Sequence, residues 1–248
     1  MEFSFQLYSA RNGAPLDETL KRLNDLGYSQ VEGWGGLYTD PVAILASLRK
    51  HGLTMPTAHF GLSDLTNSDK TFKVAETLGI KTLFCPAVPH GDRSQGDRYW
   101  EELADTLALL GEAYKAEGFD FGWHNHDFEF RPTSSGRLPM NIILDGAPSL
   151  QWEVDVAWLV VGGEDPEAWF DRYGPRITAI HVKDLAPKGE ALDEDGWADV
   201  GHGTMDWQAL YTSIRQKTAA KYFVMEHDKP SDVDRFARRS IEAARKWK

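Results

Sequence analysis

The most informative segment of the chain is Phe119-Asp120-Phe121-Gly122-Trp123-His124-Asn125-His126-Asp127. It starts with the aromatic residues that favour a buried β-strand and ends in imidazole and carboxylate side chains. Polar, titratable residues at the end of a strand are typical of enzymes built on a parallel sheet, because their active-site residues lie at the carboxyl ends of the strands. Runs of the same kind recur on both sides of this segment.

Short strand-like runs alternate with longer helical patterns along the whole sequence. The expected strands cover residues 3–9, 30–34, 55–61, 82–88, 119–126, 150–156, 177–184 and 222–228. The expected helices cover residues 16–26, 41–51, 69–78, 96–117, 165–173, 206–217 and 232–246. About eight βα units in 248 residues predict an α/β fold, a single (β/α)8 TIM barrel that forms one domain over residues 1–248.

The ends of several expected helices carry capping signals. Many begin at Asp or Pro and close near a glycine, as at Gly27, Gly52, Gly79 and Gly118, which is how helix caps are built. The fifth crossover, residues 132–148, shows the weakest helical pattern, because Gly and Pro interrupt it around one short apolar run.

Composition excludes several classes of protein. The formal net charge of −11 has no long acidic or basic block, and such a surface repels phosphodiester backbones. The single cysteine, Cys85, lies in an apolar run and indicates a buried thiol in a reducing compartment. No segment approaches the roughly 18 apolar residues of a membrane span, and the first residues lack the pattern of a signal peptide. We therefore expect a cytoplasmic protein that binds neither nucleic acid nor membrane.

Four neighbouring strands each carry a metal-capable side chain at the same rim of the expected barrel. These residues are His124, Asp155, His181 and Glu226. A mixed set of imidazoles and carboxylates suits a transition ion better than it suits Ca²⁺, which prefers oxygen ligands alone. We expect one divalent ion, with Mn²⁺ preferred and Co²⁺, Zn²⁺, Fe²⁺ or Mg²⁺ as alternatives.

Each of these residues alone has a simpler interpretation. A carboxylate at a strand end often caps the next helix, and a lone histidine is often a hydrogen-bonded structural residue. The coincidence at four strand ends favours the metal site, because several buried titratable groups need a counter-charge.

Several motifs resemble the xylose isomerase-like TIM-barrel family, which includes sugar phosphate isomerases and epimerases, inosose dehydratases and endonuclease IV-type enzymes. The most specific are Gly122-Trp123-His124-Asn125-His126-Asp127-Phe128-Glu129-Phe130, Trp152-Glu153-Val154-Asp155-Val156-Ala157-Trp158, His181-Val182-Lys183-Asp184 and Val224-Met225-Glu226-His227-Asp228. Members of that family hold one divalent ion with a Glu, an Asp, a His and a second Glu on strands five to eight. The resemblance implies that Asp155, His181 and Glu226 are ligands.

Two positions depart from the family pattern. His124 stands where the strand-five Glu would be, and in the epimerases the two Glu residues also form the acid/base pair. Glu226 then acts alone, or His124, His126 or Glu129 is the second group. Trp158 stands where many relatives carry a substrate-contacting His, and the combination resembles a subgroup known only as sugar isomerase or epimerase.

These residues support proton transfer on a ketose or keto-sugar through a metal-stabilised enediolate. We expect Glu226 as the base, with His124 or His126 returning the proton, and Lys183 stabilising negative charge on a substrate oxygen. A plain solvent-exposed Lys183 is the alternative. The expected substrate contacts are His59, His126, Glu32 and Trp158. The glycine-rich loop 199–204 lacks a phosphate-binding fingerprint, which favours a non-phosphorylated sugar.

Three rival functions follow from the same residues. A lyase would use the same metal and base to expel a β-oxygen from a keto-sugar or inosose. A non-catalytic sugar-binding protein would result if His124 has disabled the acid/base chemistry. A DNA-repair endonuclease would need more metal ligands and a basic groove, which the sequence does not offer. The sequence leaves open the sugar, the reacting C–H bond, the metal and a homo-oligomeric state.

Overall fold

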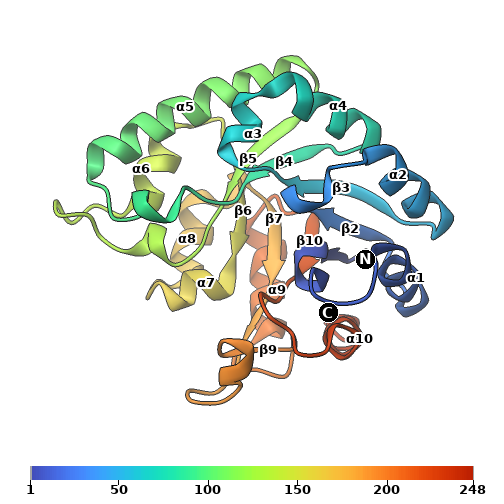
Figure 1. Cartoon of the computed structure of the whole chain (residues 1–248). Helices are drawn as coiled ribbons and strands as arrows, with labels where there is room; N and C mark the ends of the chain where they lie inside the picture. Colours follow the sequence, from blue (N-terminus) through green and yellow to red (C-terminus); the bar gives the residue numbers. More distant parts are fainter. Residues whose placement is uncertain (1, 248) are drawn as a thin grey trace.

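Eight parallel strands close into a barrel in the computed structural model of the chain, which describes residues 2–247 (Figure 1). The barrel strands are β1 (Ser4–Gln6), β2 (Gln30–Gly33), β3 (Thr54–His59), β4 (Thr82–Cys85), β5 (Asp120–His124), β6 (Gln151–Asp155), β7 (Ile177–Val182) and β10 (Tyr222–Met225). Their order around the barrel is β1-β10-β7-β6-β5-β4-β3-β2. The predicted (β/α)8 fold is confirmed.

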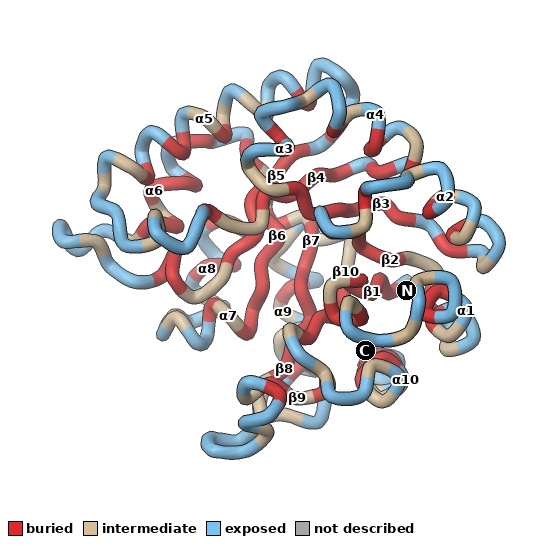
Figure 2. Tube along the Cα trace, in the orientation of Figure 1, coloured by how far each residue is buried: buried red, intermediate tan, exposed pale blue. Residues whose placement is uncertain are grey.

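Helices cover the outside of the barrel (Figure 1). They are α1 (Leu16–Leu26), α2 (Pro41–Lys50), α3 (Leu62–Thr66), α4 (Ser68–Leu78), α5 (Asp97–Ala116), α6 (Pro139–Gly146), α7 (Val156–Val161), α8 (Pro166–Tyr173), α9 (Trp207–Lys217) and α10 (Val233–Ala244). Figure 2 shows the barrel strands buried and the outer faces of the helices exposed. In α10, for example, Phe236 and Ile241 are buried while Arg238 is exposed, so one apolar face packs on the strands.

The capping signals act as the sequence predicts. Gly27, Gly52, Gly79 and Gly118 all have positive φ, the conformation that a residue without Cβ adopts at least cost. At the opposite helix ends, Asp165 caps α8 and Asp232 caps α10 through side-chain hydrogen bonds to backbone N–H groups.

The structure adds elements that the sequence pattern did not predict. The strands end earlier than expected, so His126 and Asp228 lie in loops beyond β5 and β10. The fifth crossover does contain a helix, α6, and two short helices, α3 and α7, are additional. An antiparallel pair, β8 (Asp184–Leu185) and β9 (Trp197–Ala198), forms an excursion between β7 and α9 (Figure 1).

The glycine-rich loop 199–204 closes this excursion around one buried carboxylate. Asp184 accepts hydrogen bonds from the backbone N–H groups of Gly201, Gly203 and Met205 at 2.9, 3.2 and 3.1 Å. A Cβ at Gly203 would lie 2.2 Å from Asp184 Oδ1, which explains the glycine. The amides of Gly201 and Gly203 therefore serve the fold and do not cradle a phosphate.

Two further features of the fold concern the single cysteine and the character of the helices. Cys85 is fully buried at the end of β4, as its apolar neighbours predict. Among residues 2–247, no helix combines the length and the apolar character needed to cross a bilayer.

Candidate active site with a metal-ligand cluster

A cavity opens at the carboxyl ends of the barrel strands, where the sequence places the candidate site. Seven of the predicted site residues line it: His59, His124, His126, Asp155, Trp158, His181 and Glu226. Trp34, Tyr8 and Pro86 add flat or apolar surface. Among the described residues that line the cavity there is no lysine or arginine.

Three side chains form a group that we call the rim cluster: Asp155, His181 and Glu226. One ligand atom of each lies within 4.8 Å of the others, and all three residues are buried. Asp155 Oδ2 and His181 Nδ1 have no hydrogen-bond partner, and Glu226 Oε2 pairs with the Lys183 ammonium at 2.8 Å. Buried polar atoms without partners are uncommon in native proteins, so the two in this cluster indicate a missing positive group.

The position of Asp155 is fixed from two sides. Asn125, just beyond β5, accepts a hydrogen bond from the backbone N–H of Asp155 at 3.0 Å and donates one to its carbonyl oxygen at 3.1 Å. The carboxylate oxygen Oδ1 of Asp155 accepts from the N–H of Trp158 at 2.9 Å and so caps α7. Asp155 is therefore both a helix cap, the simpler interpretation of its sequence position, and a candidate ligand through Oδ2.

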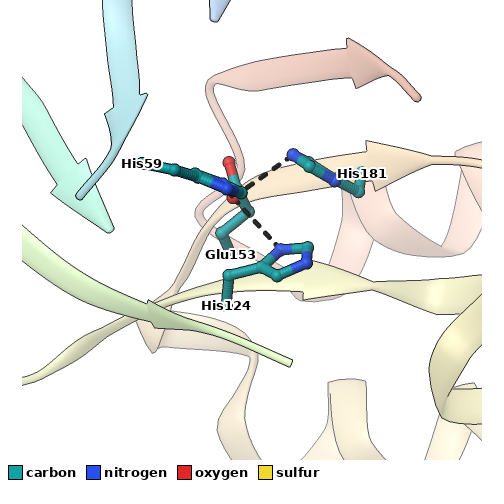
Figure 3. Close-up of side chains that lie close together, drawn as sticks. All are labelled: His59, His124, Glu153 and His181. Atoms are coloured by element: carbon teal, nitrogen blue, oxygen red, sulfur yellow. Dashed lines mark hydrogen bonds and ion pairs between the residues drawn. The ribbon is translucent and has the colours of Figure 1, made fainter. Parts of the chain in front are cut away.

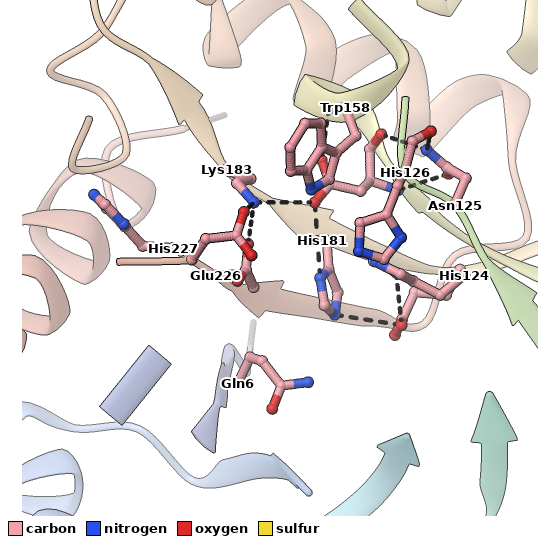
Figure 4. A network of polar contacts seen from close by, with 12 residues as sticks. Gln6, His124, Asn125, His126, Trp158, His181, Lys183, Glu226 and His227 are labelled. Atoms are coloured by element: carbon pink, nitrogen blue, oxygen red, sulfur yellow. Dashed lines mark hydrogen bonds and ion pairs between the residues drawn. The ribbon is translucent and has the colours of Figure 1, made fainter. Parts of the chain in front are cut away.

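Lys183 provides the positive charge nearest to the rim cluster (Figure 4). Its ammonium lies 2.8 Å from Glu226 Oε2 and 3.9 Å from Asp155 Oδ2, and it also contacts Asp228. The ammonium further lies 3.9 Å from the ring centroid of Trp197 in β9. Lys183 is fully buried and is not part of the cavity lining, so the solvent-exposed alternative is wrong, and the contact with a substrate oxygen stays a prediction.

One lysine does not balance the buried carboxylates. Burial raises the pKa of Asp155 to about 7 although Lys183 opposes this effect. Burial and the charge of Asp228 raise the pKa of Glu226 to about 8. Both carboxylates therefore lack sufficient positive charge, and a divalent ion beside Oδ2 of Asp155 would supply it.

A second group, which we call the floor cluster, consists of His59, His124, Glu153 and His181 (Figure 3). Three imidazole nitrogens face Glu153 Oε2, at 2.5 Å from His59 Nε2, 3.2 Å from His124 Nδ1 and 3.3 Å from His181 Nε2. Sequence reasoning did not single out Glu153. The signal was present, because Glu153 precedes Asp155 by two residues and alternate residues of a strand point to the same face.

The register of the sheet separates the predicted metal ligands into these two groups. His124 is paired with Glu153 across β5 and β6, and Asp155 is paired with His181 across β6 and β7. His124 therefore lies one layer deeper than Asp155, beside Glu153. His181 belongs to both clusters, and His124 as a ligand of the rim ion stays a prediction.

Glu32, predicted as a substrate contact, lies among the histidines, and its contact with a substrate stays a prediction. It is fully buried beneath the cavity and does not line it. Its Oε1 atom accepts from Gln6 Nε2 at 2.7 Å and lies 2.7 Å from His181 Nε2. Burial acts to raise the pKa of Glu32, but the charges of His59 and His181 hold it well below the usual range. Glu32 is thus a partner of the histidines.

His126 and Trp158, two other predicted substrate contacts, face each other across the cavity wall. Their rings lie 5.6 Å apart between centroids, and Trp158 also packs edge-on against Trp197 at 4.6 Å. Burial lowers the pKa of His126 to about 3, so its imidazole is neutral at physiological pH. A neutral imidazole can accept or donate a hydrogen bond to a substrate hydroxyl.

A closed parallel barrel with a cluster of imidazoles and carboxylates in its mouth defines a TIM-barrel protein with a candidate metal centre. The family profile of the xylose isomerase-like TIM barrel matches residues 20–247. The chain belongs to this family, as the motifs predict.

Comparison with individual proteins gives more distant likenesses. The chain is 26% identical over 144 residues to inosose dehydratase of Lacticaseibacillus casei, an alignment that covers 52% of this chain and 47% of the relative. The chain thus matches only about half the length of that curated relative.

Solved structures resemble the fold over nearly the whole chain. A sugar phosphate isomerase/epimerase from Parabacteroides distasonis is similar with a TM-score of 0.80 at 22% identity, covering 99% of this chain and 98% of that one. The IolI protein, solved with a zinc atom, is similar with a TM-score of 0.77 at 14% identity, covering 98% and 96%.

Proposed function

We propose that this protein is a divalent-metal-dependent sugar isomerase or epimerase that moves a proton next to the carbonyl of a ketose or keto-sugar. The observation that carries the proposal is the convergence of three buried ligand atoms, Asp155 Oδ2, His181 Nδ1 and Glu226 Oε2, at a cavity of the barrel mouth, where the first two have no hydrogen-bond partner. Membership of the xylose isomerase-like family supports the role of these three residues as metal ligands.

The rim cluster would hold the ion. Two carboxylates and one imidazole make an oxygen-rich set, which favours Mn²⁺, with Co²⁺, Zn²⁺, Fe²⁺ or Mg²⁺ as alternatives. When bound, the ion supplies Lewis acidity that polarises a carbonyl. With Asp155, Glu226 and Asp228 ionised and Lys183 protonated, its two positive charges would make the cluster neutral.

The protein's own residues would move the proton. Glu226 lines the cavity, and its carboxylate, ionised beside the ion, can take up a proton from a substrate carbon. His124 and His126 line another part of the cavity and could return the proton. Lys183 would act through Glu226, which it holds at 2.8 Å, as a positioning residue.

The cavity favours an uncharged sugar. Its lining includes the carboxylates of Asp155, Glu226 and Asp228, and no described lining residue is a lysine or arginine that could pair with a phosphate. Trp34 and Trp158 offer flat faces for the apolar side of a sugar ring. We therefore propose a non-phosphorylated ketose or keto-sugar, although the name of the P. distasonis relative includes sugar phosphates.

A metal-dependent lyase is the second candidate, favoured by the likeness to inosose dehydratase. The same base would remove the proton, and a β-oxygen would then leave with the electron pair. Mass spectrometry of the products separates the two reactions, because elimination loses water or an aglycone whereas isomerisation conserves mass.

The metal requirement is tested by two matched variants. Asp155 and Asp165 both cap a helix, α7 and α8, but only Asp155 belongs to the rim cluster. We expect Asp155→Asn to lose bound Mn²⁺ and all solvent-deuterium incorporation into a panel of ketoses and inososes, and Asp165→Asn to keep both. Wild type that binds metal but exchanges no deuterium with any substrate would favour a non-catalytic sugar-binding protein.

A further inference from the structure

We propose that the floor cluster holds a second metal site, which binds a transition ion through His59, His124 and Glu153, with water in the fourth position. The proposal concerns a different ion from that of the rim cluster, and the two sites share no ligand, because His181 Nε2 donates to Glu32 and leaves only Nδ1 for the rim ion. The three residues offer two nitrogens and one carboxylate oxygen within 4.8 Å of one another.

The spacing of the ligand atoms fits a tetrahedral ion. Bonds of about 2.0–2.1 Å to nitrogen and oxygen place neighbouring ligand atoms about 3.3 Å apart. The distance from Glu153 Oε2 to His124 Nδ1 is 3.2 Å. The 2.5 Å contact between Oε2 and His59 Nε2 would have to lengthen, and His59, the least buried of the three at 8% exposure, lies on the cavity wall where it has room.

The charges of the buried groups also call for a cation. Glu32 and Glu153 are both fully buried, and the ion pairs that the structure gives them among residues 2–247 are with imidazoles alone. Lys183 pairs instead with carboxylates of the rim and with Asp228. One divalent ion would neutralise both buried carboxylates while the histidines stay neutral, as metal binding requires.

Unpaired polar atoms also lie in the residues of the floor cluster and its partner Glu32. Glu32 Oε2 and Glu153 Oε1 are buried and have no hydrogen-bond partner, and His124 Nδ1 faces Glu153 Oε2 at 3.2 Å without the geometry of a hydrogen bond. They are separate from the unpaired atoms of the rim cluster, so one ion at the rim would leave them unsatisfied. Glu32 Oε1 already accepts from Gln6, which leaves Glu32 as an outer partner that orients the histidines.

The two clusters should prefer different metals. The floor site has two imidazole nitrogens to one carboxylate, whereas the rim cluster has one nitrogen to two carboxylates. Imidazole-rich sites suit Zn²⁺ or Co²⁺, and carboxylate-rich sites suit Mn²⁺ or Mg²⁺. His59 and His124 line the cavity, so an ion can reach the floor from solvent through the same opening.

Metal content of the wild type and three variants tests the second site. Each protein is purified without chelator, loaded with Zn²⁺, desalted and measured by inductively coupled plasma mass spectrometry. We expect about two ions per chain in wild type and about one in either Glu153→Gln or Asp155→Asn. Glu129→Gln is the control, because Glu129 is as buried as Glu153 but belongs to neither cluster, and it should keep both ions. Circular dichroism checks that each variant is folded.

The outcomes separate this proposal from the proposed function. One ion per chain that survives Glu153→Gln but not Asp155→Asn overturns the floor site and leaves the rim site intact. One ion with the opposite pattern supports the floor site and removes the basis for chemistry at the rim. A single ion lost in both variants means one shared site and overturns the second ion.

A measurement on the unmodified chain covers the case in which a variant does not fold. Crystals of the wild type soaked in Zn²⁺ should give an anomalous-scattering peak bonded to His59, His124 and Glu153, besides any peak at Asp155 and Glu226. A peak at the rim alone, in crystals with excess Zn²⁺, overturns the proposal.

Discussion

The Nε2 atom of His181 lies 2.7 Å from the Oε1 atom of Glu32, while Nδ1 of the same ring faces Asp155 Oδ2 at 3.9 Å. One ring therefore connects a buried carboxylate on β2 with the rim cluster. A carboxylate that accepts the N–H of a ligating imidazole fixes its tautomer and makes the other nitrogen a better donor to a metal. Glu32 thus holds His181 ready for a ligand at Nδ1.

Replacement of Glu32 by Gln should weaken Mn²⁺ binding at the rim cluster. The amide keeps the size of the side chain but not its charge, and the loss of such a partner typically costs about 10–100-fold in affinity. Competition with a chromophoric chelator measures the change. Glu129→Gln, equally buried, should bind Mn²⁺ as the wild type does. Equal affinities in all three proteins would show that Glu32 does not prepare the ligand.

Asn125→Ala should destabilise the barrel and loosen Asp155. The amide of Asn125 accepts from Trp152 Nε1 at 2.9 Å and from the Asp155 N–H at 3.0 Å, and both groups would be left buried without a partner. We expect a loss of about 3 kcal/mol in the free energy of unfolding, measured by urea denaturation. Asn67→Ala, at an exposed helix cap without a side-chain hydrogen bond, should change it by less than about 0.5 kcal/mol. Equal stability of the two variants would contradict this role.

Lys183→Met should destabilise the metal-free protein, because Asp155, Glu226 and Asp228 would lose their common cation. Breaking a buried ion pair on one side costs about 3–5 kcal/mol. Urea unfolding in the presence of EDTA measures this cost, and added Mn²⁺ should recover part of it by replacing the lost charge. Lys221→Met, at an exposed position, is the control. A variant as stable as wild type in EDTA would mean that the carboxylates are already neutral.

The contribution of Glu194 to stability should depend on pH. Burial acts to raise its pKa, but hydrogen bonds from Ser231 and Arg235 dominate and lower it from 4.5 to about 2 in the folded chain. Because the folded pKa is the lower one, the stabilisation is complete above about pH 4.5 and is lost as the pH falls towards 2.

The difference in unfolding free energy between wild type and Glu194→Gln should therefore be largest at pH 7 and shrink below pH 4.5. Urea denaturation at pH 7, 5, 4 and 3 follows this difference. A difference that stays constant over this range would show that the carboxylate charge of Glu194 adds nothing to the fold.

Much of the barrel was predictable from the sequence because its signals are local. Alternating strand and helix patterns, Asp caps and C-terminal glycines such as Gly27 and Gly79 act within a few residues of their own position. The β8–β9 excursion was not predictable in this way. It depends on hydrogen bonds to Asp184 from the backbone N–H groups of Gly201, Gly203 and Met205, which lie 17 to 21 positions further along the chain.

The fold, the family and the strand ends that carry Asp155, His181 and Glu226 can be predicted from local patterns, because parallel strands must bring their carboxyl ends to one rim. Which of these side chains meet depends on contacts between strands that are far apart in the chain. The register pairs His124 with Glu153 and Asp155 with His181, and a shift of one residue would turn every side chain to the other face. The division into a rim and a floor cluster, and the burial of Glu32 and Lys183, depend on that pairing between strands distant in the sequence.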